Sequence, residues 1–285
     1  MNLSIRPVTL ADVPACAAIC FEAFREIAEC HRFPPDLPSP AAPVGFMRSM
    51  VTQAGFFAEL AEVDGEIVGS NFMDERAQVA GIGPITVAPG VQNRSIGRRL
   101  MESALARADE FGRSGVRLVQ VAYHNRSLCL YARVGFAAVE MLSALQGPPL
   151  RVRIPDRSVR AATWDDVEAC NALCRAAHGF DRSAELDAAI SVGVAGVVEH
   201  CGRVTGYTTT VGYSGHTVAE SNADLKALIA AAPEFPGPGL LLPTRNAEVF
   251  SWCLDQDLRL VQQLTLMARG EYHEPALPWM PSVHF

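Results

Sequence analysis

Hydrophobic and polar positions along the chain recur with the periods of strands and helices, and one block shows both in succession. An apolar β-type run at residues 85–87 ends at Pro89-Gly90, a polar loop covers residues 92–95, and an amphipathic helix begins at Ile96. The apolar stripe of that helix comprises Leu100, Ala104, Leu105, Ala108 and Phe111. This order leaves unpaired backbone N–H groups at the positive end of a helix dipole, which suits a phosphate or diphosphate.

Two further features of this block bear on anion binding. Gly97 lets the loop backbone approach a ligand closely, and Arg94, Arg98 and Arg99 add positive charge around it. An ordinary strand-to-helix connection with solvated arginines would share these features, because short glycine loops are weak motifs. The residues alone leave both interpretations open.

The pattern V-x-P-x-x-Q-x-x-S-I-G-x-x-L, from Val87 to Leu100, resembles the acetyl-CoA loop of the GNAT superfamily of N-acetyltransferases. It departs from the family pattern at Ser95, where the first glycine usually stands. Serine keeps its backbone N–H but adds a Cβ, so a left-handed φ there would cost about 1 kcal/mol or more. Cofactor affinity is the property that this departure puts in question.

A second stretch, residues 124–136, resembles the other GNAT motif, N-x-x-[AS]-x-x-L-Y-x-x-x-G-F. The asparagine position of the motif falls on His124, with Asn125 one residue later. Five residues match the remaining positions: Ser127, Leu130, Tyr131, Gly135 and Phe136.

The resemblance implies a set of site residues. Backbone groups at residues 85–87 would pair with pantetheine, the loop amides would hold the diphosphate, and Tyr131 would protonate the leaving thiolate, since its ordinary pKa of about 10 lies near that of a thiol. Glu75 and His124 are the candidates for the general base, each with a solvated surface role as the alternative. The expected cofactor-binding residues are Ile85, Thr86, Val87, Gln92, Asn93, Arg94, Ser95, Ile96, Gly97, Arg98 and Asn125.

Two segments of the chain read alike: IRPVTLADVPACAAIC from Ile5 and VRAATWDDVEACNALC from Val159. Each is a short strand, a threonine N-cap with an aspartate three residues later, and an apolar helix stripe. We interpret them as a duplication. The sequence therefore predicts two domains, a GNAT N-acetyltransferase domain at residues 1–148 and a degenerate GNAT-like domain at residues 149–285, divided by a Pro- and Gly-rich stretch.

The expected fold is α/β of the α+β type: two tandem GNAT-like domains, each a mixed, mostly antiparallel sheet flanked by helices. Pro84 cannot donate to a sheet ladder, so it predicts a bulge or an unpaired edge in the strand at residues 81–87. In the GNAT family the fourth and fifth strands splay there and open a slot for pantetheine. The family also implies that the proline-rich loop at residues 31–40 lines the acceptor pocket, although its composition fits a plain surface loop equally well.

The second copy lacks the cofactor loop. Acidic residues and no G-x-G occupy residues 215–225, and Trp252 stands near the tyrosine place, where it cannot act as a general acid. We expect this half to serve as a scaffold.

Composition narrows the class of protein. Hydrophobic residues make up 49% of the 285 and charged residues 19%, which predicts a packed soluble core, and a net charge of −7 argues against nucleic-acid or polybasic membrane roles. No signal-peptide pattern or apolar run of spanning length occurs, so we expect a cytoplasmic protein, and abundant alanine and arginine suggest a GC-rich bacterial genome. The eight cysteines are expected to be reduced core residues, with no metal bound.

Two functions remain from the sequence. The first is an acetyl-CoA-dependent N-acetyltransferase that transfers an acetyl group directly to the amine of a small molecule, working as a monomer or homodimer without nucleic-acid or membrane partners. The second is a non-catalytic acyl-CoA-binding sensor or interaction module.

Overall fold

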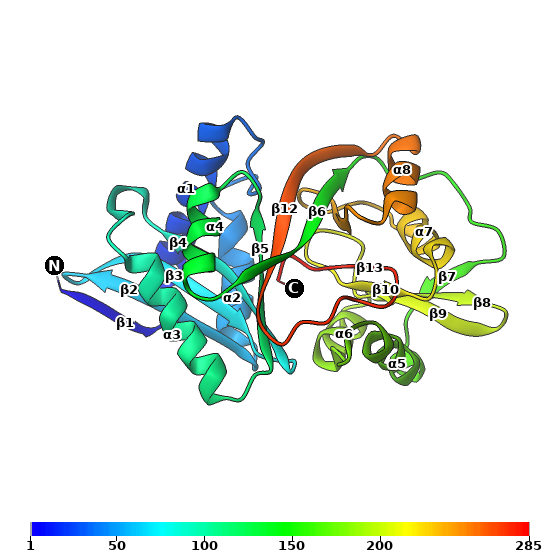
Figure 1. Cartoon of the computed structure of the whole chain (residues 1–285), viewed down its shortest axis with the longest axis horizontal. Coiled ribbons are helices and arrows are strands. Elements are labelled where there is room, and N and C mark those ends of the chain that lie inside the picture. The colour runs from blue at the N-terminus through cyan, green and yellow to red at the C-terminus, as the bar shows by residue number, and fades with distance from the viewer. Residues whose placement is uncertain (1, 285) are drawn as a thin grey trace. The chain divides into compact units, whose positions relative to one another are not determined.

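The computed structural model describes residues 2–284, and the chain divides into two compact units (Figure 1). The first unit contains the chain up to Ala137 together with Met267–Gly270 and His284. The second contains Ala138–Leu266 and Glu271–Val283.

The first unit has a central sheet with the strand order β1-β2-β3-β4-β5, followed by the C-terminal end of β12. The β4–β5 pair is parallel, whereas the pairs from β1 to β4 are antiparallel. In chain order the elements are β1 (Leu3–Pro7), α1 (Val13–His31), α2 (Ala42–Thr52), β2 (Phe56–Val63), β3 (Glu66–Asp74), β4 (Val79–Val87), the 3-10 turn η1 (Pro89–Val91), α3 (Ile96–Glu110), β5 (Gly115–Val121) and α4 (Asn125–Arg133).

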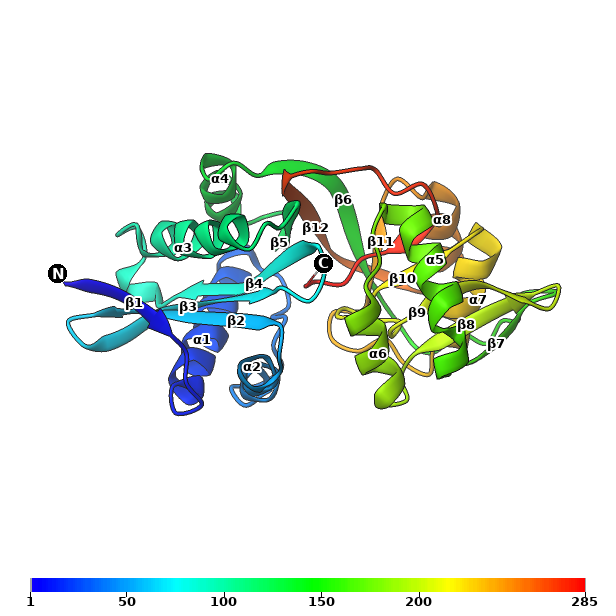
Figure 2. The same ribbon diagram turned by 90° about the horizontal axis from the view of Figure 1, so that it is seen from below.

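Helices cover both faces of this sheet, with α3 on one face and α1 and α2 on the other (Figure 2). Successive strand residues point to opposite faces, so neighbouring residues serve different cores. Leu60 and Phe72 pack against α1 and α2, whereas Met73 packs with Met101 of α3. Both faces are therefore filled by apolar side chains that the strand and helix periods place there.

The second unit has a five-stranded antiparallel sheet with the order β13-β10-β9-β8-β7. Beside it, β6 pairs antiparallel with β11. The elements are β6 (Ala137–Gln146), β7 (Ser158–Ala161), the 3-10 turn η2 (Trp164–Asp166), α5 (Val167–His178), α6 (Ser183–Ser191), β8 (Gly196–His200), β9 (Arg203–Thr208), β10 (Thr217–Ala219), α7 (Asn222–Ala231), β11 (Leu240–Pro243), α8 (Ala247–Asp255), β12 (Arg259–Gly270) and β13 (Trp279–Met280).

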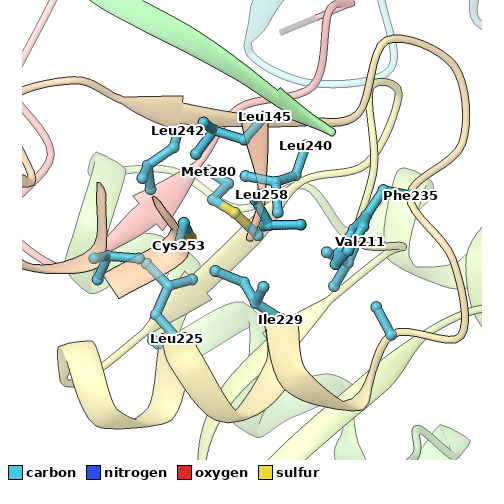
Figure 3. Packing of buried hydrophobic residues seen from close by; sticks show 13 residues of the cluster. Leu145, Val211, Leu225, Ile229, Phe235, Leu240, Leu242, Cys253, Leu258 and Met280 are labelled. Carbon is cyan, nitrogen blue, oxygen red and sulfur yellow. The ribbon is translucent and has the colours of Figure 1, made fainter. Parts of the chain in front are cut away.

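A hydrophobic cluster holds the second unit together on the α7 side of its sheet. Figure 3 shows Leu225 and Ile229 of α7 facing Leu240 and Leu242 of β11, with Met280 of β13 in the same cluster. All five side chains are buried. The C-terminal segment therefore contributes a strand and a core residue to this unit.

The sequence repeat corresponds to a structural repeat. In the first unit, Arg6 of β1 binds both carboxylate oxygens of Asp12 and also Glu62 of β2. In the second unit, Arg160 of β7 binds both oxygens of Asp166 and also Glu199 of β8. Each aspartate further accepts the N–H and O–H of the threonine three residues before it, as the capping-box pattern predicts: Thr9 in the first unit and Thr163 in the second.

The mixed α/β fold with two mostly antiparallel sheets flanked by helices confirms the expected fold class. The division between the compact units differs in position from the expected boundary between residues 148 and 149. The second unit begins at Ala138, so it includes nearly all of β6, and the last four residues of β12 return to the first unit. Sequence composition marks the linker after β6, but strand pairing decides which unit each strand joins.

The cysteines and the helix lengths bear on two expectations from the sequence. All eight cysteines are free, and those that occupy corresponding positions of the repeat are buried: Cys16, Cys20, Cys170 and Cys174. Cys253 is buried too, whereas Cys30, Cys129 and Cys201 are exposed, which corrects the expectation that every cysteine lies in a core. Between residues 2 and 284, no helix combines the length and the apolar character needed to cross a bilayer.

Candidate active site

The strands β4 and β5 pair over a short distance and then separate. Their parallel pairing runs from Val79 opposite Gly115 to Gly81 opposite Arg117, although β4 continues to Val87. The register between β3 and β4 shifts just beyond this point, where Pro84 lies, which confirms the bulge predicted from that proline. One edge of residues 85–87 therefore pairs with β3, and the other edge is not paired with β5.

The loop after β4 leads directly into α3 and is held in place by its own side chains. Gln92 Nε2 donates to the backbone oxygen of Val87 at 3.0 Å, and Arg126 of α4 donates to Gln92 Oε1. Asn93 and Ser95 both adopt left-handed backbone conformations, with φ of 66° and 63°. Ser95 therefore takes the conformation that its position in the family pattern requires, despite its Cβ.

The start of α3 has no side-chain cap. Ser95 stands at the N-cap position without a cap hydrogen bond from its side chain, and the first helical bond joins the Arg99 N–H to the Ser95 oxygen. The amides of Ile96, Gly97 and Arg98 come before that bond, so helix geometry provides them with no partner within the helix. Three amides at the positive end of a helix can hold the oxygens of a diphosphate.

The side chains around these amides leave room and carry charge. Gly97 has a helical backbone, and a Cβ there would meet Leu130 and Val87 only at 3.5 and 3.6 Å, so neither packing nor φ demands glycine. Arg94, Arg98 and Arg99 are exposed, and Arg98 pairs with Glu102 at 2.7 Å. The structure therefore places the expected cofactor-binding residues 92–98 together at the start of α3.

The equivalent helix of the second unit begins differently. Ser221 caps α7 by accepting the Asp224 N–H, and the Asp224 carboxylate lies buried in the first turn. That carboxylate binds Arg157 at 2.8 Å and Thr205 at 3.0 Å. A helix start that already holds an internal anion repels a diphosphate, which agrees with the expectation that the second half lacks the cofactor loop.

Three polar side chains lie along one face of α4. Ser127 Oγ lies 2.7 Å from His124 Nδ1, and the Ser127 hydroxyl is close enough to Tyr131 to lower the pKa of its phenol. The spacing of three and then four residues places all three on one stripe of the helix. Tyr131 is 7% exposed and packs in a cluster with Ile82 of β4 and Leu118 of β5, where those strands separate.

Burial shifts the pKa values of Tyr131 and His124 in the directions that favour their neutral forms. It raises the pKa of Tyr131 to about 12, against a smaller lowering by the Ser127 hydrogen bond. Together with smaller effects of the positive charges of Arg126 and His31, it lowers the pKa of His124 to about 4. At neutral pH the phenol therefore keeps its proton and the imidazole keeps a free lone pair, the states required of an acid and a base.

Glu75, the other candidate base, is engaged in an ion pair. Arg107 of α3 donates to both of its carboxylate oxygens, at 2.7 and 2.9 Å, and the Arg107 guanidinium also lies over the rings of Phe57 and Phe111. Glu75 is 7% exposed. With both oxygens accepting from one guanidinium, this carboxylate joins β3 to α3 and is poorly placed to accept a proton from an amine.

The proline-rich loop that follows α1 contacts Tyr123, a residue just before α4 that the sequence motifs do not include. The Phe33 ring stacks on Tyr123 with centroids 4.3 Å apart, and His31 lies 5.2 Å from the same ring. Burial raises the pKa of Tyr123 to about 12, and the negative charge of Asp36 adds to this effect. The proline-rich loop therefore lies against the residue preceding His124, as the family resemblance implies for an acceptor pocket.

Ser127 and Tyr123 differ in how far the sequence predicts their contacts. Ser127 was recognised only as a motif match, although its helical spacing from His124 and Tyr131 predicts the contact. Tyr123 has no local signal, because its contacts come from a loop some ninety positions earlier in the chain. Asn125, expected to contact the cofactor, is exposed at the first position of α4.

Comparison with known proteins bears on the family and the fold. Residues 21–136 match the family model described as acetyltransferase (GNAT) family. A search of curated proteins found no match. A putative acetyltransferase from Pyrococcus horikoshii has a similar structure, with a TM-score of 0.72 and 19% identity, covering 95% of this chain and 90% of that one.

Smaller structures match about half of the chain. The PaiA N-acetyltransferase from Thermoplasma acidophilum, solved in complex with coenzyme A, is 14% identical and covers 49% of this chain and 92% of its own, with a TM-score of 0.44. A ribosomal-protein-alanine N-acetyltransferase from Brucella melitensis is 21% identical and covers 50% and 88%, with a TM-score of 0.42. Residues 21–136 thus match the GNAT acetyltransferase family model, and the likeness to the Pyrococcus horikoshii structure along both halves of the chain shows a shared fold.

Proposed function

We propose that the first unit transfers an acetyl group from acetyl-CoA to the amine of a small molecule by direct attack. The observation that carries this proposal is the uncapped start of α3, joined to α4 through Gln92 and Arg126, beside a tyrosine packed where β4 and β5 separate. The amides of Ile96, Gly97 and Arg98 suit the diphosphate of CoA. The unpaired edge of residues 85–87 suits the pantetheine amides, which would add to it as a strand does.

Acetyl-CoA supplies an acetyl group activated as a thioester. The residues of the protein position that group and move one proton, because the amine must lose a proton as it is acylated and the sulfur must gain one. Backbone N–H groups at residues 85–87 would polarise the thioester carbonyl. The neutral phenol of Tyr131 donates its proton to the departing sulfur.

In this proposal Ser127 passes a proton from the base, His124, to the acid, Tyr131. His124 Nε2 is buried and has no hydrogen-bond partner within residues 2–284, so it is available to accept the amine proton. His124 Nδ1 then donates to Ser127 Oγ, and Ser127 donates to Tyr131 Oη as Tyr131 gives its own proton to sulfur. The proton lost by nitrogen is thus balanced by the proton gained by sulfur, with each side chain returned to its neutral form.

CoA binding is tested by giving α3 the acidic first turn that α7 has. Arg98 stands at the third helical position of α3, as Asp224 does in α7. Arg98→Asp is expected to weaken CoA binding by about 10-fold or more, while an acid in the first turn leaves α3 stable. Arg48→Asp, on the exposed face of α2, makes the same change in net charge and is expected to leave the affinity unchanged. Calorimetric titration with CoA measures both.

The catalytic half is tested by CoA release over a panel of small amines. Exposed cysteines would react with a thiol reagent, so free CoA is measured by chromatography. Tyr131→Phe is expected to lower kcat by about 10²-fold or more with CoA affinity unchanged, and Ser127→Ala to lower kcat by about 10-fold without a large change in KM. CoA binding with no release for any amine, and no effect of Tyr131→Phe, would favour the acyl-CoA sensor instead.

A further inference from the structure

Three side chains of metal-binding type meet in the second unit. Cys174 and His178 lie four residues apart on one face of α5, and His216 directly precedes β10. One ligand atom from each lies within 4.8 Å of the other two. The Nε2 atoms of the two histidines are 3.0 Å apart. Sequence spacing brings only the first two together, and the fold supplies the third.

All three side chains are buried, and the surrounding residues hold them in place. His216 is 1% exposed, and its Nδ1 lies 3.3 Å from the hydroxyl of Tyr207 on β9. With Nδ1 protonated and donating to Tyr207, Nε2 keeps its lone pair directed toward His178. Histidine ligands of metals are commonly oriented by this kind of hydrogen bond from the other ring nitrogen.

Aromatic and charged groups complete the surroundings. Trp279 of β13 lies edge-on to His178 with ring centroids 5.2 Å apart, and Phe180 lies 5.9 Å away. The buried Arg182 is paired with Glu185 at 2.6 Å, so its charge is neutralised locally. These groups enclose the cluster without placing an unbalanced cation against it.

We propose that Cys174, His178 and His216 bind one transition-metal ion of the zinc class. One thiolate and two imidazoles form a ligand set that zinc favours, with metal–ligand distances of about 2.0–2.3 Å. Such distances require the ligand atoms to lie about 3.3–3.6 Å apart in a tetrahedral site, so the two histidine nitrogens separate by a few tenths of an ångström on binding. The thiol gives up its proton to solvent as the sulfur–metal bond forms, and one coordination position remains for water or a small anion.

An ion bound here would connect two parts of the second unit. Its ligands come from the end of α5 and the segment before β10, and β10 pairs with β13 of the C-terminal segment. A bound ion would therefore join the end of α5 to β10 and thereby brace the strand that holds the C-terminal segment. The proposal is independent of the acetyl transfer assigned to the first unit, since it concerns residues of the second unit alone.

Cobalt titration of the full chain tests the proposal, because Co²⁺ replaces Zn²⁺ and a thiolate ligand gives a charge-transfer absorption band. The background variant carries Cys30→Ala, Cys129→Ala and Cys201→Ala, which removes the exposed thiols, including Cys201 with its Sγ 3.4 Å from His200 Nε2. We expect one cobalt ion per chain, a thiolate band, and displacement of cobalt by one equivalent of zinc. Absence of the band in this background, with all three ligands intact, would overturn the proposal.

Matched variants assign the site. Cys174→Ala is expected to abolish the band, whereas Cys170→Ala, which removes a buried cysteine one turn earlier on the same helix, retains it. Tyr207→Phe keeps the ring but loses the bond to His216, and is expected to weaken cobalt binding by about 10- to 100-fold. A band that survives Cys174→Ala would overturn the assignment of this site, and equal affinity in Tyr207→Phe would overturn the role of Tyr207 in orienting His216. Circular dichroism verifies folding of each variant.

Discussion

Glu59 shows how a single buried residue sets a pH dependence. Its carboxyl group lies between β2 and α3, 2% exposed, and one oxygen accepts from Ser103 Oγ at 2.6 Å. Burial raises the pKa of Glu59 from 4.5 to about 7, against smaller lowering effects of the hydrogen bonds from Ser103 and Asn71. The native protein therefore holds a proton that the unfolded chain releases, so stability falls as pH rises from 4.5 to about 7 and then levels off.

Glu59→Gln should remove this fall. The variant is expected to exceed the wild type in free energy of unfolding by on the order of 2–3 kcal/mol at about pH 8, and to differ little near pH 4.5. Urea denaturation at both values measures the difference. Ser103→Ala, which removes the bond that favours the charged carboxylate, should shift the midpoint of the wild-type pH dependence upward. Equal stability of Glu59→Gln and wild type at about pH 8 would contradict the argument.

At the scale of elements, the starts of helices carry much of the chemistry. α3 begins at a residue with positive φ and no side-chain cap, whereas α7 and α8 are capped by Ser221 and Asn246. The folded chain holds Ser95 at a φ of 63°, so the cost of that conformation falls on folding.

Ser95→Gly should therefore stabilise the fold by about 0.5–1 kcal/mol and change CoA affinity by less than about 3-fold. The matched variant is Ser49→Gly in the interior of α2, where glycine is expected to destabilise by about 0.5–1 kcal/mol. Thermal denaturation and CoA titration compare the two. A large gain in CoA affinity in Ser95→Gly would contradict this prediction, because it would mean that the conformational cost at Ser95 arises on cofactor binding.

The start of α5 illustrates the second kind of helix beginning, an internal ion pair with a capping box. Arg160 and the Thr163 hydrogen bonds hold the pKa of Asp166 down to about 2 despite burial, which opposes them. Because the folded pKa lies below the ordinary value of 3.8, the contribution to stability is present above pH 3.8 and is lost as pH falls through about 2.

Asp166→Asn is expected to cost about 1–2 kcal/mol at neutral pH, a value reduced for the partial exposure of Arg160, and much less near pH 2. The exposed neighbour Asp165 serves as the control, since Asp165→Asn should change stability by less than about 0.5 kcal/mol. Urea titrations across the acid range distinguish the two variants, and an equal loss at both ends of that range would refute the linkage to this carboxylate.

At the scale of the whole molecule, the two units are interleaved in sequence. Residues Met267–Gly270 belong to the first unit, where Arg269 binds both oxygens of Asp109 at 2.9 Å and its backbone oxygen accepts from Arg117. The strand β6 belongs to the second unit, where it pairs with β11. A cut between residues 148 and 149 therefore removes a strand end from one unit and a whole strand from the other.

A fragment ending at residue 148 is accordingly expected to unfold at lower denaturant concentration than the first unit does within the full chain, or to aggregate, because β5 loses its β12 neighbour and the ladder edge of β6 is exposed. Circular dichroism and CoA titration of the fragment and the full chain compare them. Cooperative unfolding of the fragment at the same midpoint, with equal CoA affinity, would show that the returning strand is dispensable.

Local patterns were sufficient for most of the elements. The strand at Phe56–Val63, the bulge at Pro84, the helix start at Ile96 and the repeated capping boxes depend on contacts between residues close in sequence, and periodicity records such contacts. The family motif likewise predicts the cofactor loop and the role of Tyr131, which stay predictions. The ion pair of Glu75 with Arg107 was beyond this reasoning, because thirty-two positions separate the partners.

The sequence by itself thus determined the fold class, the duplication and the position of the loop that we propose to bind the cofactor, all of which depend on local periodicity and on residues with special backbone demands. Only the tertiary structure decided which base candidate is free, which strands each unit holds, and that His216 meets Cys174 and His178. Those outcomes depend on side chains that come together from distant strands and helices. Such long-range contacts produce no periodic pattern along the sequence.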